Sequence, residues 1–179
     1  MNFFSLALLL AIRDVNGVDR QPLRPDAGKA NALFFISEEC PISNAFGREI
    51  ARICAGYQSK GIGCDLVYVD PATTDEQART HALQYGHGDY PRIVDRRHEL
   101  VKATGVTVTP EAAVVNREGK VVYRGRIDDS IAALGQPRRP VKDADLRDAL
   151  DAVVAGKSVA KPETKALGCY IGDFTPGKR

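Results

Sequence analysis

Two apolar runs of strand length flank a segment with helical spacing in the first half of the chain. Residues 31–37 ("NALFFIS") and 64–70 ("CDLVYVD") are mostly apolar, which is typical of strands buried on both faces of a sheet. Between them a helix is predicted to begin at Pro41, because proline suits a first helical turn. Its apolar residues recur with helical period: Ile42, Ala45, Phe46, Ile50, Ile53, Cys54 and Tyr57. The order strand, helix, strand predicts a βαβ unit with parallel strands.

The second half of the chain alternates short elements with turn residues. Its predicted elements are a helix over 71–86 capped by Thr73 or Thr74, a short strand over 90–95, a short helix over 96–105, a hairpin of strands 112–115 and 120–124 around "NREG", a loop at 136–140 ("QPRRP"), and a helix over 143–156 with Asp143 as its cap. This order predicts an α/β sandwich with a mixed central sheet and helices on both faces. We expect one domain over residues 8–157, followed by a tail without periodicity (158–179) that carries Cys169.

The N-terminal run 3–12 ("FFSLALLLAI") has two interpretations. It is too short to span a bilayer as a helix, so no stable membrane insertion is expected beyond a signal. Residues 1–12 are either a truncated export signal or the start of the first strand, because no Lys or Arg precedes the run and no small-residue cleavage site follows it. We favour an exported, periplasmic protein, with a cytoplasmic one as the alternative.

Charge and composition limit the classes of partner. The chain has 25 Lys and Arg residues and 23 Asp and Glu residues, which gives a net charge of +2, and it has no tryptophan. The basic residues are scattered among acids, so no nucleic-acid partner is expected. The four cysteines form no C-x-x-C pair and lack metal-ligand spacing, so we expect neither metal nor cofactor. His81, His87 and His98 are interpreted as structural or surface residues.

Cys40 is the residue best placed for chemistry. It stands directly before the predicted helix at Pro41, where unpaired N–H groups and the helix dipole favour a thiolate. Glu38 and Glu39 oppose ionisation by repulsion. Ser43 lies one turn along the helix and is placed to donate a hydrogen bond to the sulfur.

Two segments resemble those of thioredoxin-fold proteins, and specifically the redoxin branch, which includes bacterial thiol–disulfide oxidoreductases and peroxiredoxins. "FFISEECPIS" resembles that family's active-site strand, loop and helix start, in which tryptophan precedes C-P-x-C. Cys40 and Pro41 match the first cysteine and its proline, whereas Glu39 and Ser43 replace the tryptophan and the second cysteine. "GVTVTPEAAVVNREGKVVYRG" resembles the family's Thr-Pro segment and last hairpin, with Thr109 and Pro110 at the position of the cis-proline.

The resemblance implies a three-layer sandwich and a thiol–disulfide exchange activity. Cys40 would be the nucleophile towards protein thiols or disulfides, and the partner chain would lie extended near Pro41, Thr109 and Pro110. Because Ser43 cannot resolve a mixed disulfide, either external thiols or a cysteine from elsewhere must do so. Cys169 is the candidate, since a similar Gly-Cys-x-Ile ending occurs in redoxin-like proteins with an "ECPIS"-type motif. A monomer without cofactor is expected.

Other interpretations stay open at this point. A thiol peroxidase with antioxidant activity would need a Thr or Ser three residues before Cys40, a proline seven residues before it, and a nearby arginine. Ser37 fits, Leu33 does not, and Arg126 is the candidate positive charge. A non-catalytic member would bind a protein or copper. Separately, Cys54 and Cys64 are interpreted as core residues, with a structural disulfide as the alternative.

Overall fold

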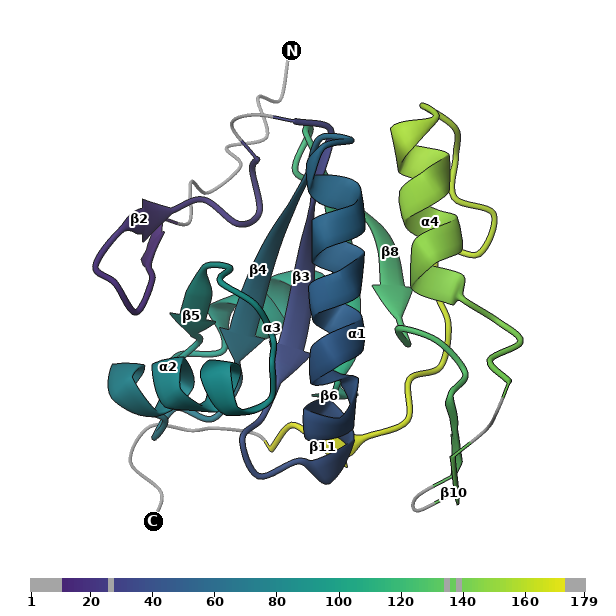
Figure 1. Cartoon of the computed structure of the whole chain (residues 1–179). Coiled ribbons are helices and arrows are strands. Elements are labelled where there is room, and N and C mark those ends of the chain that lie inside the picture. The colour runs from purple at the N-terminus through teal and green to yellow at the C-terminus, as the bar shows by residue number, and fades with distance from the viewer. Residues whose placement is uncertain (1–10, 26–27, 134–135, 138–139, 173–179) are drawn as a thin grey trace.

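The computed structural model describes residues 11–25, 28–133, 136–137 and 140–172. Its centre is a five-stranded sheet with the order β5-β4-β3-β7-β8 (Figure 1). β3 and β5 both run parallel to β4, whereas β7 is antiparallel to β3 and to β8. The strands of this sheet are β3 (Ala30–Ile36), β4 (Ile62–Tyr68), β5 (Arg92–Val94), β7 (Glu111–Asn116) and β8 (Val121–Gly125).

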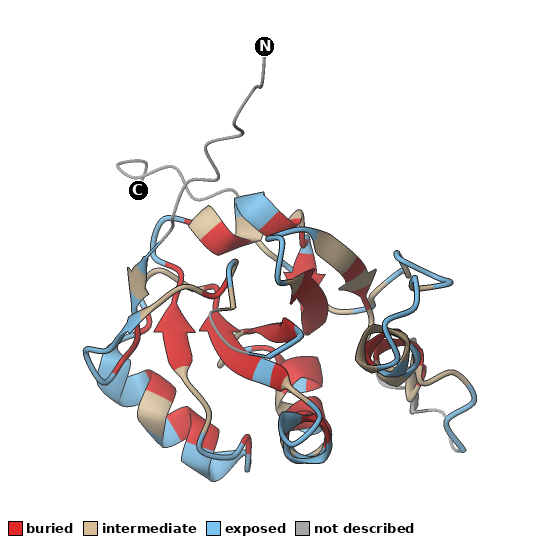
Figure 2. Cartoon of the chain, turned by 90° about the horizontal axis from the view of Figure 1, so that it is seen from above, coloured by how far each residue is buried: buried red, intermediate tan, exposed pale blue. Residues whose placement is uncertain are grey.

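Helices cover both faces of this sheet, which confirms the predicted α/β sandwich. β3 is buried over its whole length, and its side chains alternate between two cores: Phe34 belongs to the core that includes residues of α1, α2 and α4, and Leu33 to the core on the other face that includes Leu100 of α3. Figure 2 shows the buried residues in the middle layer, with exposed residues on the outer sides of the helices. The helices are α1 (Pro41–Gln58), α2 (Asp75–Gln84), α3 (Glu99–Thr104) and α4 (Asp145–Val154).

The main helices follow the sequence pattern closely. α1 begins at Pro41, and the residues of its buried face include Ile50, Ile53 and Cys54. α2 begins after Thr74, whose hydroxyl accepts from Gln77 N at 3.2 Å while the Gln77 side chain accepts from Thr74 N at 2.8 Å. This reciprocal capping box fixes the helix start, and it selects Thr74 over the alternative cap Thr73.

Three boundary predictions were wrong. Asp143 does not cap α4, whose N-cap is Ala144, because the Asp143 carboxylate pairs with Arg126 at 3.1 Å instead. The predicted loop at 136–140 contains β10 (Gln136–Pro137), which pairs with β9 (Ile131–Ala133). β4 begins at Ile62, two residues earlier than predicted.

The N-terminal prediction is only partly within the described residues. Residues 1–10, which carry most of the apolar run, lie outside them. β1 (Ile12–Arg13) pairs with β2 (Asp19–Arg20) in a separate two-stranded sheet, so this described end of the run is not a strand of the central sheet. The chain turns back at once because Gly17 takes a φ of 79°. Among the described residues, no helix has the length and apolar character needed to cross a membrane.

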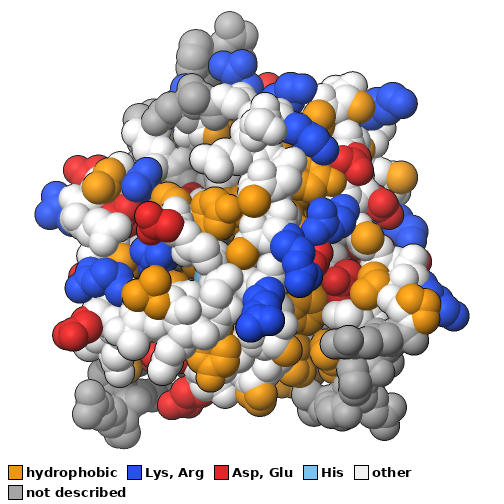
Figure 3. All heavy atoms as spheres, in the orientation of Figure 1, with side chains coloured by type: hydrophobic (Ala, Val, Ile, Leu, Met, Phe, Trp, Pro, Cys, Tyr) orange, Lys and Arg blue, Asp and Glu red, His pale blue; other side chains and the backbone are white. Residues whose placement is uncertain are grey.

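On the surface, basic and acidic side chains are intermixed. Figure 3 shows Lys and Arg side chains beside Asp and Glu side chains on the face that carries α1 and α4. Arg147 of α4 donates to Glu49 of α1 at 2.6 Å, and Arg52 donates to the same carboxylate at 3.0 Å. The first ion pair links α4 to α1 over the sheet, whereas the second lies within α1.

Candidate active site

Cys40 occupies the N-cap position of α1. Its φ and ψ of −87° and 108° are extended, so the chain turns into the helix directly after it. Pro41 stands at the first helical position, where its missing N–H leaves no donor unpaired. The side chain of Cys40 is only 1% exposed and belongs to the core beneath α1. The sulfur is therefore fixed by its surroundings.

Three segments that are distant in sequence meet at the Cys40 sulfur. The Cys40 thiol donates to the Thr109 carbonyl at 3.1 Å, and the Thr109–Pro110 peptide bond is cis. The backbone N–H and the hydroxyl of buried Ser43 are both hydrogen-bonded to the Cys40 sulfur, and so is the thiol of Cys169. The structure thus brings together Cys40, Ser43, Thr109, Pro110 and Cys169.

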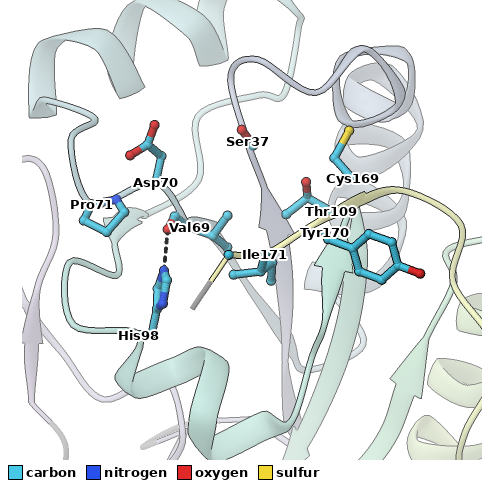
Figure 4. Close-up of a pocket in the computed structure, with 10 residues that line it drawn as sticks. Ser37, Val69, Asp70, Pro71, His98, Thr109, Cys169, Tyr170 and Ile171 are labelled. Atoms are coloured by element: carbon cyan, nitrogen blue, oxygen red, sulfur yellow. Dashed lines mark hydrogen bonds between the residues drawn. The ribbon is translucent and has the colours of Figure 1, made fainter. Parts of the chain in front are cut away.

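Cys169 reaches this position because the tail forms a strand. β11 (Cys169–Tyr170) pairs antiparallel with β6 (Val108–Thr109), and Cys169 lies opposite Thr109. The tail approaches closely at Gly168, where an added Cβ would lie 2.1 Å from the Thr109 carbonyl oxygen. In Figure 4 the Cys169 sulfur points towards the start of α1, away from the exposed Tyr170 ring.

The two sulfurs differ in acidity. Burial raises the pKa of Cys40, but hydrogen bonds from Cys169, Ser43 and Thr109 outweigh it and bring the pKa down to about 7. Burial and the neighbouring Cys40 sulfur together raise the pKa of Cys169 to about 11. At neutral pH a large part of Cys40 is therefore thiolate, whereas Cys169 is protonated.

The fold agrees with a comparison against known families. Residues 28–121, more than half of the chain, match the family described as thioredoxin-like. The chain belongs to the thioredoxin-like family.

Solved structures similar to this thioredoxin-like protein include uncharacterised proteins and, in fold alone, a disulfide oxidoreductase. It is similar to an uncharacterised conserved protein from Geobacillus kaustophilus (26% identity, 94% of this chain and 89% of that one, TM-score 0.78). It is also similar to a hypothetical protein from Sinorhizobium meliloti (28% identity, 93% and 91%, TM-score 0.74). A secreted disulfide oxidoreductase from Mycobacterium tuberculosis shares the fold (14% identity, 83% and 96%, TM-score 0.54). No match was found among curated proteins.

Two predicted electrostatic residues lie outside this cluster. Glu39 is exposed in the loop before Cys40. Arg126 directs its guanidinium at α4, with Nε 2.6 Å from an Asp145 oxygen and Nη2 3.1 Å from one of Asp143. The carboxylates of Asp143 and of Asp145 in α4 therefore pair with the positive charge on which the peroxidase interpretation depends.

A chain of polar side chains that sequence analysis missed supports the active-site loop of the thioredoxin-like protein. Asn44 Nδ2 donates to the Glu38 carbonyl at 3.0 Å, and its Oδ1 lies 2.8 Å from His81 Nε2. His81 Nδ1 lies 3.1 Å from the Tyr68 hydroxyl. The signal was weak, because Asn44 follows "CPIS" on the helix and His81 stands among polar neighbours.

The histidines and the other two cysteines are interior residues. His81, His87 and His98 are at most 5% exposed, so of the two expected roles, structural and surface, burial supports the structural one for all three. His98 contacts the Val69 carbonyl through Nε2 at 2.7 Å and lines a pocket of about 270 Å³ beside Cys169 (Figure 4). Cys54 and Cys64 are buried free thiols that are hydrogen-bonded to each other. Among the described residues, no group of three or more His, Cys, Asp or Glu side chains is arranged to hold a metal.

The pKa difference leads to a direct prediction. We expect the rate at which Cys40 reacts with a small thiol probe to rise with pH, with a midpoint at about 7, because only the thiolate reacts. Replacing Cys169 by alanine removes a donor to that thiolate, so the midpoint should move to higher pH. Cys169→Ser keeps a donor and should lie between the two. Alkylation rates measured by mass spectrometry over a pH series test this, and an unchanged midpoint in Cys169→Ala would contradict it.

Proposed function

We propose that this thioredoxin-like protein is a thiol–disulfide oxidoreductase in which Cys40 is the nucleophile and Cys169 the resolving cysteine. One observation carries the proposal: the two sulfurs are hydrogen-bonded beside Thr109–Pro110, with pKa values of about 7 and about 11. A low pKa suits an attacking thiol at neutral pH, and a protonated neighbour suits a second step. Cys169 thereby takes the role that Ser43 cannot fill.

The exchange runs in two balanced steps. The Cys40 thiolate attacks one sulfur of a partner disulfide, forming a mixed disulfide and releasing the other partner sulfur as a thiolate that takes a proton from water. The Cys169 thiol then gives up its proton and attacks the Cys40 sulfur. A Cys40–Cys169 disulfide forms, and the partner leaves with both cysteines reduced. A dithiol protein or a low-molecular-weight thiol returns the pair to its reduced form.

The other site residues have supporting roles in this proposal. Ser43 stabilises the Cys40 thiolate through its N–H and hydroxyl, and Thr109 does so through its hydroxyl alone. Pro41 starts the helix directly behind the sulfur, and Pro110 shapes the groove in which an extended partner chain lies. The partners are protein thiols or disulfides. Likeness in fold to a secreted disulfide oxidoreductase supports an exported location, where disulfides persist.

Peptide mapping under non-reducing conditions tests the proposal. After oxidation with glutathione disulfide, we expect one linked pair of peptides that contains Cys40 and Cys169. Cys169→Ser should instead accumulate glutathione on Cys40, because nothing resolves that mixed disulfide. Finding Cys169 free and Cys40 glutathionylated in the unaltered protein would support monothiol chemistry and overturn the two-cysteine cycle.

A further inference from the structure

The segment Gly168–Ile171 lies on the strand where a partner chain is expected. Cys169 and Tyr170 pair with Thr109 and Val108 of β6, and Ile171 N donates to the Thr107 carbonyl at 3.0 Å. This pairing is the antiparallel strand addition by which an extended peptide binds a sheet edge. The tail therefore occupies the groove beside Pro110 as a bound peptide would.

A close approach at Gly168 fixes the register of this strand. A Cβ at this position would lie 2.1 Å from the Thr109 oxygen and 2.7 Å from the Thr109 carbonyl carbon, both of which are backbone atoms. No side chain can move aside to relieve such a contact. A residue without a side chain is thus required directly before the cysteine that faces Cys40.

The following residues alternate between the protein and the solvent. Cys169 packs on the core that contains Cys40, Tyr170 is 89% exposed, and Ile171 packs on the opposite core beside Val69. Figure 4 shows the Tyr170 ring pointing away from the pocket that Ile171 lines. The groove therefore accommodates three features along the strand: a glycine at 168, a cysteine at 169 and an aliphatic residue at 171.

With the tail seated, the Cys40 sulfur is closed to a large partner. Its side chain is 1% exposed and is hydrogen-bonded to Cys169. An incoming disulfide must approach the attacking sulfur closely and along the direction of its own S–S bond. A protein disulfide can reach Cys40 only after Cys169 and its strand have moved off β6.

We propose that residues 168–171 are an internal copy of the partner segment. The groove along β6 takes an extended Gly-Cys-x-aliphatic segment whose cysteine is disulfide-bonded, and this segment must displace the tail before Cys40 attacks it. The proposal rests on the proposed function and names its substrate class. Once the mixed disulfide has formed, the returning tail brings Cys169 to the same sulfur and expels the partner.

Activated peptides test this with the full chain. Every variant carries Cys169→Ser, so that the first adduct accumulates. The probe is the peptide Ala-Leu-Gly-Cys-Tyr-Ile-Gly with its cysteine as a mixed disulfide with thiopyridine, and 2,2′-dipyridyl disulfide is the small probe. Attack by Cys40 forms the peptide adduct and releases thiopyridone, which is measured by absorbance. A Cys40→Ser/Cys169→Ser protein corrects for other thiols.

Gly168→Ala and Gly172→Ala form the matched pair, because an added Cβ at Gly172 meets nothing within 4 Å. Gly168→Ala should loosen the tail and raise the rate with the peptide about tenfold over Gly172→Ala, as expected for the loss of one or two backbone hydrogen bonds. On the protein with Gly168 unchanged, a peptide with valine before its cysteine should react at least about tenfold more slowly than the glycine peptide. In both comparisons, the rate with dipyridyl disulfide is the reference to which the peptide rates are normalised.

The outcomes separate the two proposals. Equal peptide rates for Gly168→Ala and Gly172→Ala, or equal rates for the glycine and valine peptides, would overturn the internal copy while leaving exchange at Cys40 intact. A Cys40 that reacts with neither probe in any variant would overturn the proposed function and this inference with it. The peptide comparison needs no change at Gly168, so it holds even where Gly168→Ala disturbs folding.

Discussion

Replacing Cys40 by serine should abolish disulfide exchange, lowering turnover by roughly three orders of magnitude or more. The hydroxyl of serine stays protonated at neutral pH and is a weak nucleophile without a base, whereas the thiol of Cys40 has a pKa of about 7. The measurement is the reduction of a disulfide-bonded peptide, followed by mass spectrometry with a dithiol as the source of electrons.

Cys169→Ser separates the two steps of the same reaction. Without added dithiol, it should consume about one equivalent of disulfide and stop as a mixed disulfide on Cys40, because the second step lacks its thiol, whereas the unaltered protein should end with a Cys40–Cys169 disulfide. Cys54→Ser is the matched control: burial raises the pKa of that thiol and the residue lies at the other end of α1, so turnover should be unchanged. Full turnover in Cys40→Ser, with loss in Cys169→Ser, would reverse the two roles.

Leu33→Ala should lower the free energy of unfolding by about 2–5 kcal/mol. Leu33 is fully buried in β3 and belongs to the same core as Phe35, Val67 and Leu100, on the face covered by α3. Truncation removes buried apolar surface and leaves a cavity that two neighbouring strands and a helix cannot close. A loss of this size is a large part of the roughly 5–15 kcal/mol that stabilises a typical domain. Urea denaturation measures it.

The same substitution at Leu83 provides the control. Leu83 is 79% exposed on α2, and alanine is a good helix former, so Leu83→Ala should change the free energy of unfolding by less than about 0.5 kcal/mol. Equal effects at the two positions would mean that the α3 face of the sheet contributes little to stability.

Much of the fold could be predicted from local patterns. The apolar run that contains Leu33 and Phe34 predicts a strand buried on both faces, as β3 is. The spacing of Ile50, Ile53 and Cys54 predicts one buried face of a helix, as in α1. Thr74 capped its helix as its side chain predicts. These features depend on residues that are close together in the chain, so a single sequence is enough to predict them.

What could not be predicted depends on contacts between distant residues. Asp143 resembled a helix cap, but Arg126, across the fold, pairs with its carboxylate. The two-residue strand β11 is too short to show any period, and its place beside Thr109 is visible only once the chain is folded. The choice between a structural and a surface role for His81 could not be made, because its polar sequence neighbours lie on the other faces of α2 and not on the face that packs on Tyr68.

The pairing of β11 with β6 also affects the competition between Cys169 and free thiols for a mixed disulfide on Cys40. A cysteine held at the end of a paired strand acts on its target as an intramolecular reagent, at an effective concentration far above that of thiols free in solution. Under the proposed two-cysteine cycle, the lifetime of a Cys40 mixed disulfide would be set by how quickly the strand returns to β6, and not by the thiol content of the compartment. Serine at position 43 is then compatible with fast turnover, because Cys169, held near Cys40 by the pairing of β11 with β6, takes the place of a second cysteine at position 43.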